Sequence, residues 1–157
     1  MKKVSFLSKV RKEGKLKLVE PSEEIKDSYL KKSESYLYSA KLLFNNNRLE
    51  ESISLAYYSM YYSLLALLFK VGIKSENHTA SIILLKKLFG IDNRKIIRAK
   101  KERIDKQYYV SFSLAREDVE KLIRDAEVFN SKMFDVIEKL RKEDVIKLRE
   151  KFKLMVK

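Results

Sequence analysis

Residues 52–78 read SISLAYYSMYYSLLALLFKVGIKSENH, and this stretch decides which fold the chain can adopt. Apolar and aromatic side chains recur there at steps of three and four residues, on two faces of one helix. The first face holds Ile53, Ala56, Tyr57, Met60, Leu64, Leu67 and Val71, and the second holds Tyr58, Tyr61, Tyr62, Leu65 and Phe69. A helix that is apolar on nearly every side must be enclosed by other helices. The stretch therefore predicts the central helix of a helical bundle.

The composition of the chain favours a single all-α domain. It has 157 residues, with one Pro, three Gly and no Cys. That length is typical of one domain with its own core, and so few Pro and Gly residues favour long helices over a sheet with many turns. The absence of Cys excludes disulfides and thiolate metal sites. A single histidine, His78, excludes a His-rich metal centre. We therefore expect neither a metal nor a cofactor.

The sequence predicts a cytoplasmic protein that does not contact a membrane. Its first residues, MKKVSFLSKVRKEGKLK, are basic and mixed, without the apolar region of a signal segment. Tyr and Ser interrupt the most apolar stretch of the chain. For that reason, no apolar run is expected to reach the length of a membrane span.

The rest of the sequence predicts five or six helices in an antiparallel bundle. Ser22 is suited to cap the first long helix, and Gly72 is suited to end the second at Val71. Gly14 is expected to break any earlier helix. The helices are expected at about 22–44, 49–71, 77–89, 93–109 and 114–140. The expected organisation is a basic N-terminal arm over 1–20, the bundle over 21–140 and a basic C-terminal helix or tail over 141–157.

The positive charge of the chain is concentrated in three blocks. The formal net charge is +13 at pH 7. Residues 1–20 hold seven Lys and Arg against two acidic residues, residues 94–106 hold seven against two, and residues 139–157 hold eight against three. Clustered cations attract phosphates, and such binding weakens with salt. The alternative is that these blocks are solvated faces of Lys-rich helices.

The central stretch also resembles the second helix of HEPN domains. The resemblance rests on Ala56-Tyr57-Tyr58-Ser59-Met60-Tyr61-Tyr62, followed by Gly72-Ile73 and His78. It extends from about Val19 to Leu140. It implies an all-α, antiparallel bundle of the HEPN type with extra short helices. It also implies a homodimer that accompanies a small nucleotidyltransferase in a toxin–antitoxin-like system.

Many HEPN domains are metal-independent ribonucleases whose motif is an Arg, four to six residues and then a His. The positions at that spacing before His78 are Val71, Gly72 and Ile73, and none of them is Arg. The ribonuclease motif is therefore absent, and no catalytic residue is assigned. His78 is expected to be a capping or packing residue, and the chain is not expected to be an enzyme.

A second segment is similar to a HEPN variant in which an Arg precedes an acidic–aromatic pair. Arg103 could bind a phosphate with two hydrogen bonds, and Tyr108 or Tyr109 could stack on a base. The alternative is an ion pair between Arg103 and Asp105, with the tyrosines packed into the bundle. The candidate nucleotide- or RNA-binding residues are Arg98, Lys100, Lys101, Arg103, Asp105, Tyr108 and Tyr109.

Three functions follow from these patterns. The first is a nucleotide- or RNA-binding accessory module. The second is a ribonuclease with a non-standard site of Arg103 with Tyr108 or Tyr109. The third is a structural interaction protein whose basic arms contact nucleic acid. The tyrosines of the central helix are candidates for a homodimer interface, since amphipathic aromatics suit interfaces; they are Tyr57, Tyr58, Tyr61 and Tyr62.

Overall fold

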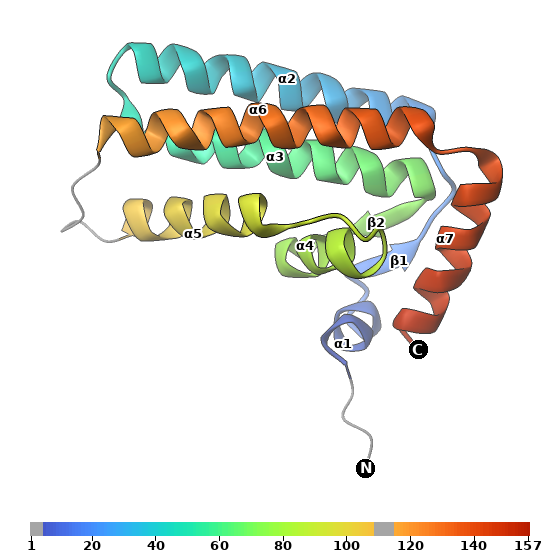
Figure 1. Cartoon of the computed structure of the whole chain (residues 1–157). Coiled ribbons are helices and arrows are strands. Elements are labelled where there is room, and N and C mark those ends of the chain that lie inside the picture. Colours follow the sequence, from blue (N-terminus) through green and yellow to red (C-terminus); the bar gives the residue numbers. More distant parts are fainter. Residues whose placement is uncertain (1–4, 109–114) are drawn as a thin grey trace.

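The computed structural model describes residues 5–108 and 115–157, and their side chains except those of 106–108 (Figure 1). The described residues form seven helices and one two-stranded sheet, which confirms the all-α prediction. The helices are α1 (Phe6–Lys12), α2 (Glu23–Asn45), α3 (Leu49–Val71), α4 (His78–Lys87), α5 (Arg94–Tyr108), α6 (Arg116–Lys139) and α7 (Lys142–Met155). The strands are β1 (Leu16–Leu18) and β2 (Ile73–Ser75), which pair antiparallel.

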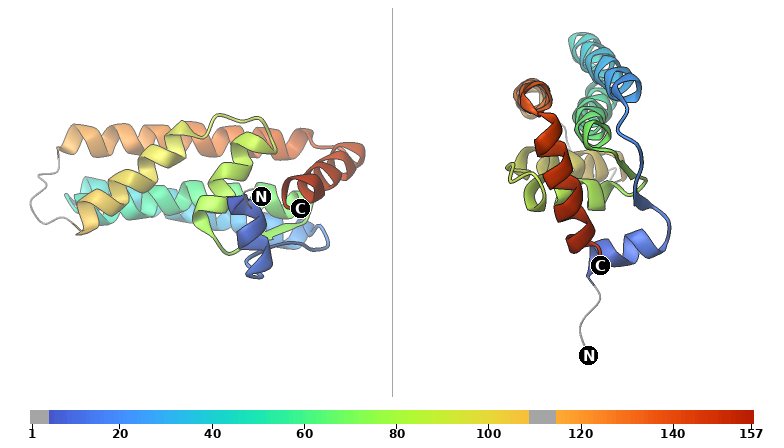
Figure 2. Two further views of the ribbon diagram at one scale, coloured as in Figure 1. Left: turned by 90° about the horizontal axis from the view of Figure 1, so that it is seen from below. Right: turned by 90° about the vertical axis from the view of Figure 1, so that its right-hand side faces the viewer.

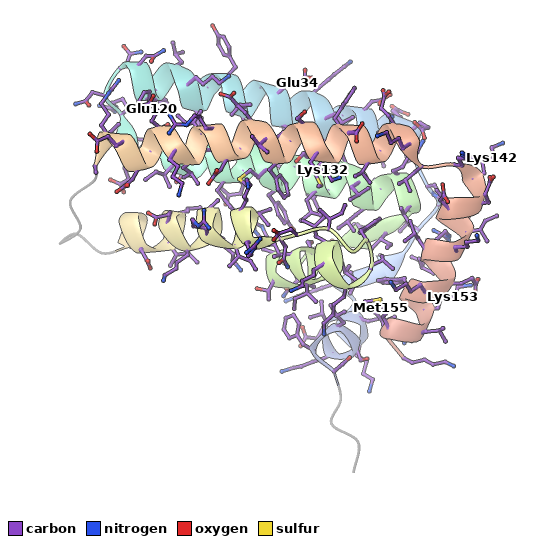
Figure 3. All side chains as sticks on the ribbon, viewed as in Figure 1. Glu34, Glu120, Lys132, Lys142, Lys153 and Met155 are labelled. Atoms are coloured by element: carbon purple, nitrogen blue, oxygen red, sulfur yellow. The ribbon has the colours of Figure 1, made fainter. Side chains whose placement is uncertain are left out.

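Helix α3 is the centre of the bundle, as its sequence predicts. It packs against α2, α5 and α6, and 15 of its 23 residues are buried. Figure 1 shows α2, α3 and α6 running alongside one another, with α5 below them. Helix α4 lies next to one end of α5. Charged side chains such as Glu34 on α2 and Glu120 on α6 project from the outer faces of the bundle (Figure 3).

The helix ends follow local sequence signals. The Ser22 hydroxyl accepts a hydrogen bond from the Ile25 backbone N–H at 3.1 Å, which confirms its predicted capping role. Gly72 ends α3 with a φ of 81°, a left-handed conformation that favours glycine. The C-terminal residues form a separate helix, α7, rather than an extension of α6.

The segment expected to be an arm folds onto the bundle in its described part. A short helix, α1, forms within the segment expected to be an arm, and it ends at Lys12, just before Gly14, as the glycine predicts. Leu7, Val10 and Leu16 are buried. The Arg11 guanidinium donates to the Val156 carbonyl at 3.0 Å, so α1 lies beside the end of α7 (Figure 2). Tertiary contacts therefore hold this short helix, because seven residues are too few for a stable isolated helix.

Arg149 joins α7 to the end of the central helix. Its Nη1 donates to the carbonyl oxygens of Val19 at 2.8 Å, Val71 at 3.0 Å and Gly72 at 3.1 Å. Carbonyls at a helix C-terminus have no partner within the helix, and a guanidinium satisfies them well. This contact connects three segments that are distant in sequence.

Helix α3 is long and apolar enough to cross a membrane when judged by length and composition alone. The prediction that no apolar run reaches this length was therefore wrong. However, 78% of its most apolar window is buried inside the bundle. The protein interior provides the apolar surroundings that this helix needs, which is the pattern of a core helix.

Candidate functional site

The aromatic face of α3 meets the start of α4 and one side of α5. Ile96 and Ala99 of α5 are fully buried, which holds this basic helix close to the core. Helix α4 begins at His78, and the Asn77 side chain caps it by accepting from the Ala80 N–H at 2.8 Å. Asn77, and not His78, therefore has the capping role. This arrangement brings the only histidine of the chain to the junction of the three helices.

His78 is held by tyrosines of α3. Its Nδ1 lies 2.8 Å from the Tyr57 hydroxyl oxygen, at hydrogen-bonding distance. Its ring stacks on that of Tyr61, with centroids 3.8 Å apart and an angle of 14° between the planes. Burial lowers the pKa of His78, and the cations Lys100 and Arg103 lower it further. The imidazole is therefore neutral at pH 7 and fixed in one orientation.

Arg103 of α5 lies over the rings of Tyr57 and Tyr58, and the ring of Tyr58 also meets the imidazole of His78 edge-on. The Arg103 Cζ is 4.9 Å from the ring centroid of Tyr58 and 5.7 Å from that of Tyr57, within the range of cation–π attraction. Its Nε is buried without a hydrogen-bond partner among the described residues. Among the described residues, Arg103 makes no ion pair with Asp105. The Arg103–Asp105 pair that the sequence offered as the alternative is therefore not formed in this part of the chain.

Lys100 lies one turn before Arg103 and is half-buried. Its Nζ donates to the Thr79 hydroxyl at 2.9 Å, across the gap between α5 and α4. Burial lowers the pKa of Lys100, and the positive charge of Arg103 lowers it further. Among the side chains that the structure describes, no carboxylate pairs with this ammonium. Two adjacent cations thus share a partly enclosed position without a counter-ion from those side chains.

Two neighbouring cations on α5 have acidic partners, whereas Lys95 and Lys101 pair with no carboxylate among the described residues. Arg94 pairs with Asp92 at 2.7 Å, and Arg98 pairs with Asp125 of α6 at 3.5 Å. Lys100 and Arg103 are more enclosed than Arg94 and Arg98 and have no acidic partner within the described residues. They differ from Lys95, which is also partly enclosed, because Lys100 contacts Thr79 of α4 and Arg103 lies over tyrosine rings of α3. We call His78, Lys100 and Arg103, with Tyr57 and Tyr58 behind them, the cationic site.

The predicted candidates separate into three groups. Lys100 and Arg103 belong to the cationic site, whereas Arg98 is in an ion pair and Lys101 is exposed. Asp105 is outside the cationic site and lines a pocket between α4 and α5 that Lys100 also lines. The side chain of Tyr108 and the whole of Tyr109 lie outside the described residues, so their predicted stacking role stays a prediction.

The predicted interface tyrosines lie at different depths. Tyr57 is fully buried and Tyr61 is only 4% exposed within one chain, so neither ring has surface left for a partner. Burial also raises the pKa of Tyr57, and it raises that of Tyr61 to about 12. Tyr58 and Tyr62 are half-buried. Any contribution of these tyrosines to a dimer interface is therefore restricted to Tyr58 and Tyr62.

His78 and Thr79 are the members of this region that no sequence pattern assigned to a site. The spacing rule considers only an Arg that precedes the histidine in the chain. Here, the arginine comes from a later helix and faces the same tyrosine rings as His78. One feature of the sequence could have indicated the role of His78. The only histidine of the chain follows a tyrosine-rich central helix, and a basic helix that packs against that helix would come close to the histidine.

Comparisons with known proteins agree with this architecture. A family model described as HEPN domain matches residues 27–136, which include every residue of the cationic site. A UPF0332 protein of Pyrococcus horikoshii is 41% identical over 65 residues, which cover 41% of this chain and 43% of that protein. A UPF0332 protein of Archaeoglobus fulgidus is 28% identical over 118 residues, which cover 71% of this chain and 94% of that protein. The match thus spans less than half of the first relative and nearly all of the second.

Proposed function

This chain belongs to the HEPN domain family, and from that premise we propose that it binds the phosphate groups of nucleotides or RNA at the cationic site. One observation carries the proposal. Lys100 and Arg103 lie side by side in a partly enclosed position, with no carboxylate partner among the described residues. Enclosing cations without a counter-charge is costly, and a bound phosphate would remove that cost.

The chemistry of the site suits a phosphate. A guanidinium presents paired N–H donors that match two phosphate oxygens, and an ammonium adds a compact positive charge. His78 and Thr79 lie in the first turn of α4, where backbone N–H groups have no partner within the helix. The start of a helix also favours negative charge. The start of α4 and the facing side of α5 therefore offer three kinds of donor: a guanidinium, an ammonium and backbone N–H groups.

The proposal includes partners that the resemblance to HEPN proteins implies. We propose a homodimer that acts as the accessory module of a small nucleotidyltransferase in a toxin–antitoxin-like system. Sedimentation as a monomer at high micromolar concentration would contradict the homodimer. Failure to co-purify with a nucleotidyltransferase expressed from a neighbouring gene would contradict the accessory role.

A second candidate function is RNA cleavage without metal. The specific observation in its favour is that His78 and Arg103 approach the same tyrosine rings, although no Arg–His motif exists in the sequence. A neutral imidazole beside a guanidinium can transfer protons while the guanidinium stabilises phosphate charge. Cleavage of RNA in chelator by the wild type, and its loss in His78→Ala, would establish this activity. Binding without cleavage would leave the accessory role.

The binding proposal is tested by titrating a fluorescent single-stranded RNA at fixed salt. Arg103→Ala should weaken binding by about 1–3 kcal/mol, as the loss of a charge-assisted hydrogen bond does. The matched control is Arg124→Ala, which removes an exposed arginine from a surface pair with Glu120 on α6. Equal losses in the two variants would reduce the cationic site to general surface charge.

A further inference from the structure

A groove runs between α4 and α5 beside the cationic site. It encloses about 380 Å³, which lies toward the lower end of the range for small-molecule pockets. Its walls are mainly aliphatic, with Ile82 and Ile83 from α4 and Ile97 and Ile104 from α5. Ile97 is 48% exposed and Ile104 is 37% exposed. These two side chains are seven residues apart, so they lie on one face of α5.

The groove and the cationic site meet at Lys100, which belongs to both. Thr79 and Lys100, which are joined by a hydrogen bond of 2.9 Å, line the groove, and Lys100 also belongs to the cationic site. A ligand that places an anionic group at Lys100 would therefore have its attached part at the mouth of the groove. The faces of that attached part must be apolar, because the walls of the groove are mainly apolar.

The polar groups in the groove walls can accept hydrogen bonds. Asp105 contributes a half-buried carboxylate that has no ion-pair partner in the described part of the chain. The Asn93 amide nitrogen donates to the Ile82 carbonyl at 2.9 Å, which fixes the amide and leaves its oxygen as an acceptor. A flat group with apolar faces and N–H donors at its edge would satisfy both the walls and these acceptors.

A nucleobase has these properties, and in a nucleotide it is attached to a phosphate. We propose that the α4–α5 groove binds the base of a nucleotide whose phosphate is held by Lys100 and Arg103. This inference rests on the proposed function and adds a subsite to it. It also distinguishes this ligand from a simple anion, which would use the cations alone and leave the isoleucines uncovered.

The test compares three probes by calorimetric titration of the full chain at fixed salt: AMP, ribose 5-phosphate and inorganic phosphate. AMP should bind at least about tenfold more tightly than ribose 5-phosphate, since burying the faces of a base against apolar walls is worth roughly that factor. Ile97→Asn should lower AMP affinity and leave ribose 5-phosphate affinity unchanged. The control Leu154→Asn, at a 68% exposed position on α7, should change neither.

Each contrary outcome has a distinct meaning. Equal affinity for AMP and ribose 5-phosphate, or an unchanged AMP affinity in Ile97→Asn, would overturn the groove while leaving phosphate binding at the cationic site intact. If Ile97→Asn altered sedimentation but not AMP affinity, the groove would be a contact between two copies of the chain, which also overturns the inference. If neither RNA nor any of the three probes bound, the proposed function itself would be contradicted, and the groove proposal with it.

Discussion

The neutral state of His78 is a consequence of its surroundings. Its ring is stacked on Tyr61, and Lys100 and Arg103 add positive charge nearby. Both burial and like charge disfavour the imidazolium. A bound phosphate would reverse the second effect by placing negative charge between the cations and the imidazole. The histidine should therefore take up a proton more readily when the site is occupied.

The lowered pKa of His78 predicts a pH-dependent stability. In the unfolded chain a histidine has a pKa of about 6.5, so on acidification the unfolded state binds the proton first. The free energy of unfolding should therefore decrease as pH falls below about 6.5, until the lower pKa of the folded state is reached. Urea unfolding at pH of about 7.5 and about 5.5 should show a larger decrease for the wild type than for His78→Gln. The same decrease in both proteins would contradict the burial of a neutral His78.

Residue by residue, the sequence pointed to the two cations that the structure places together, but not to the histidine beside them. Arg103 and Lys100 could be proposed because positive charge is dense around them in a segment that also resembles a HEPN variant. The role of His78 could not, because its contact with Tyr57 joins residues 21 positions apart and depends on how α4 meets α3. The sequence also did not show which cations of α5 have an acidic partner, because the partner of Arg98 comes from α6.

At the scale of elements, the connection between α3 and β2 is expected to be important for the free energy of unfolding. Gly72 has a left-handed backbone conformation, and a Cβ there would collide with the Arg149 guanidinium and the Val19 carbonyl oxygen. Arg149 itself bonds three carbonyls around this turn. The close approach of three segments therefore depends on the missing side chain of this glycine.

Gly72→Ala should destabilise the fold much more than a glycine replacement in open space. Gly90 is the matched control, because its φ is also positive, at 68°, and nothing lies within 4 Å of an added Cβ. Gly90→Ala should cost about 1–2 kcal/mol from backbone strain alone, whereas Gly72→Ala should cost several kcal/mol because the collision adds to the strain. Thermal unfolding of both variants measures the difference. Similar melting temperatures would show that Arg149 moves aside without cost.

The long helices were predictable because their patterns are long. The bounds of α3 were predicted correctly, and those of α2 and α6 closely, since apolar periodicity over more than twenty residues leaves little ambiguity. Helix α1 and the small sheet were missed. Both are too short to have a periodic signal, and both depend on contacts with distant segments, such as the pairing of β1 with β2.

At the scale of the whole molecule, the positive charge and the cationic site have separate roles in this account. The formal net charge of +13 attracts any polyanion over a distance and makes its binding sensitive to salt. The cationic site adds a fixed position where one phosphate meets donors from α4 and α5. General attraction would act through many exposed lysines, whereas fixed binding must change the surroundings of His78.

The most direct test follows the only histidine of the chain by NMR. The imidazole signals of His78 are titrated with pH in the free protein and with saturating single-stranded RNA. We predict a pKa below the usual value of about 6.5 in the free protein and a higher pKa in the complex, because the phosphate charge stabilises the imidazolium. RNA that binds while the His78 signals and their titration stay unchanged would show that phosphate is held elsewhere, which would contradict the cationic site as the binding site.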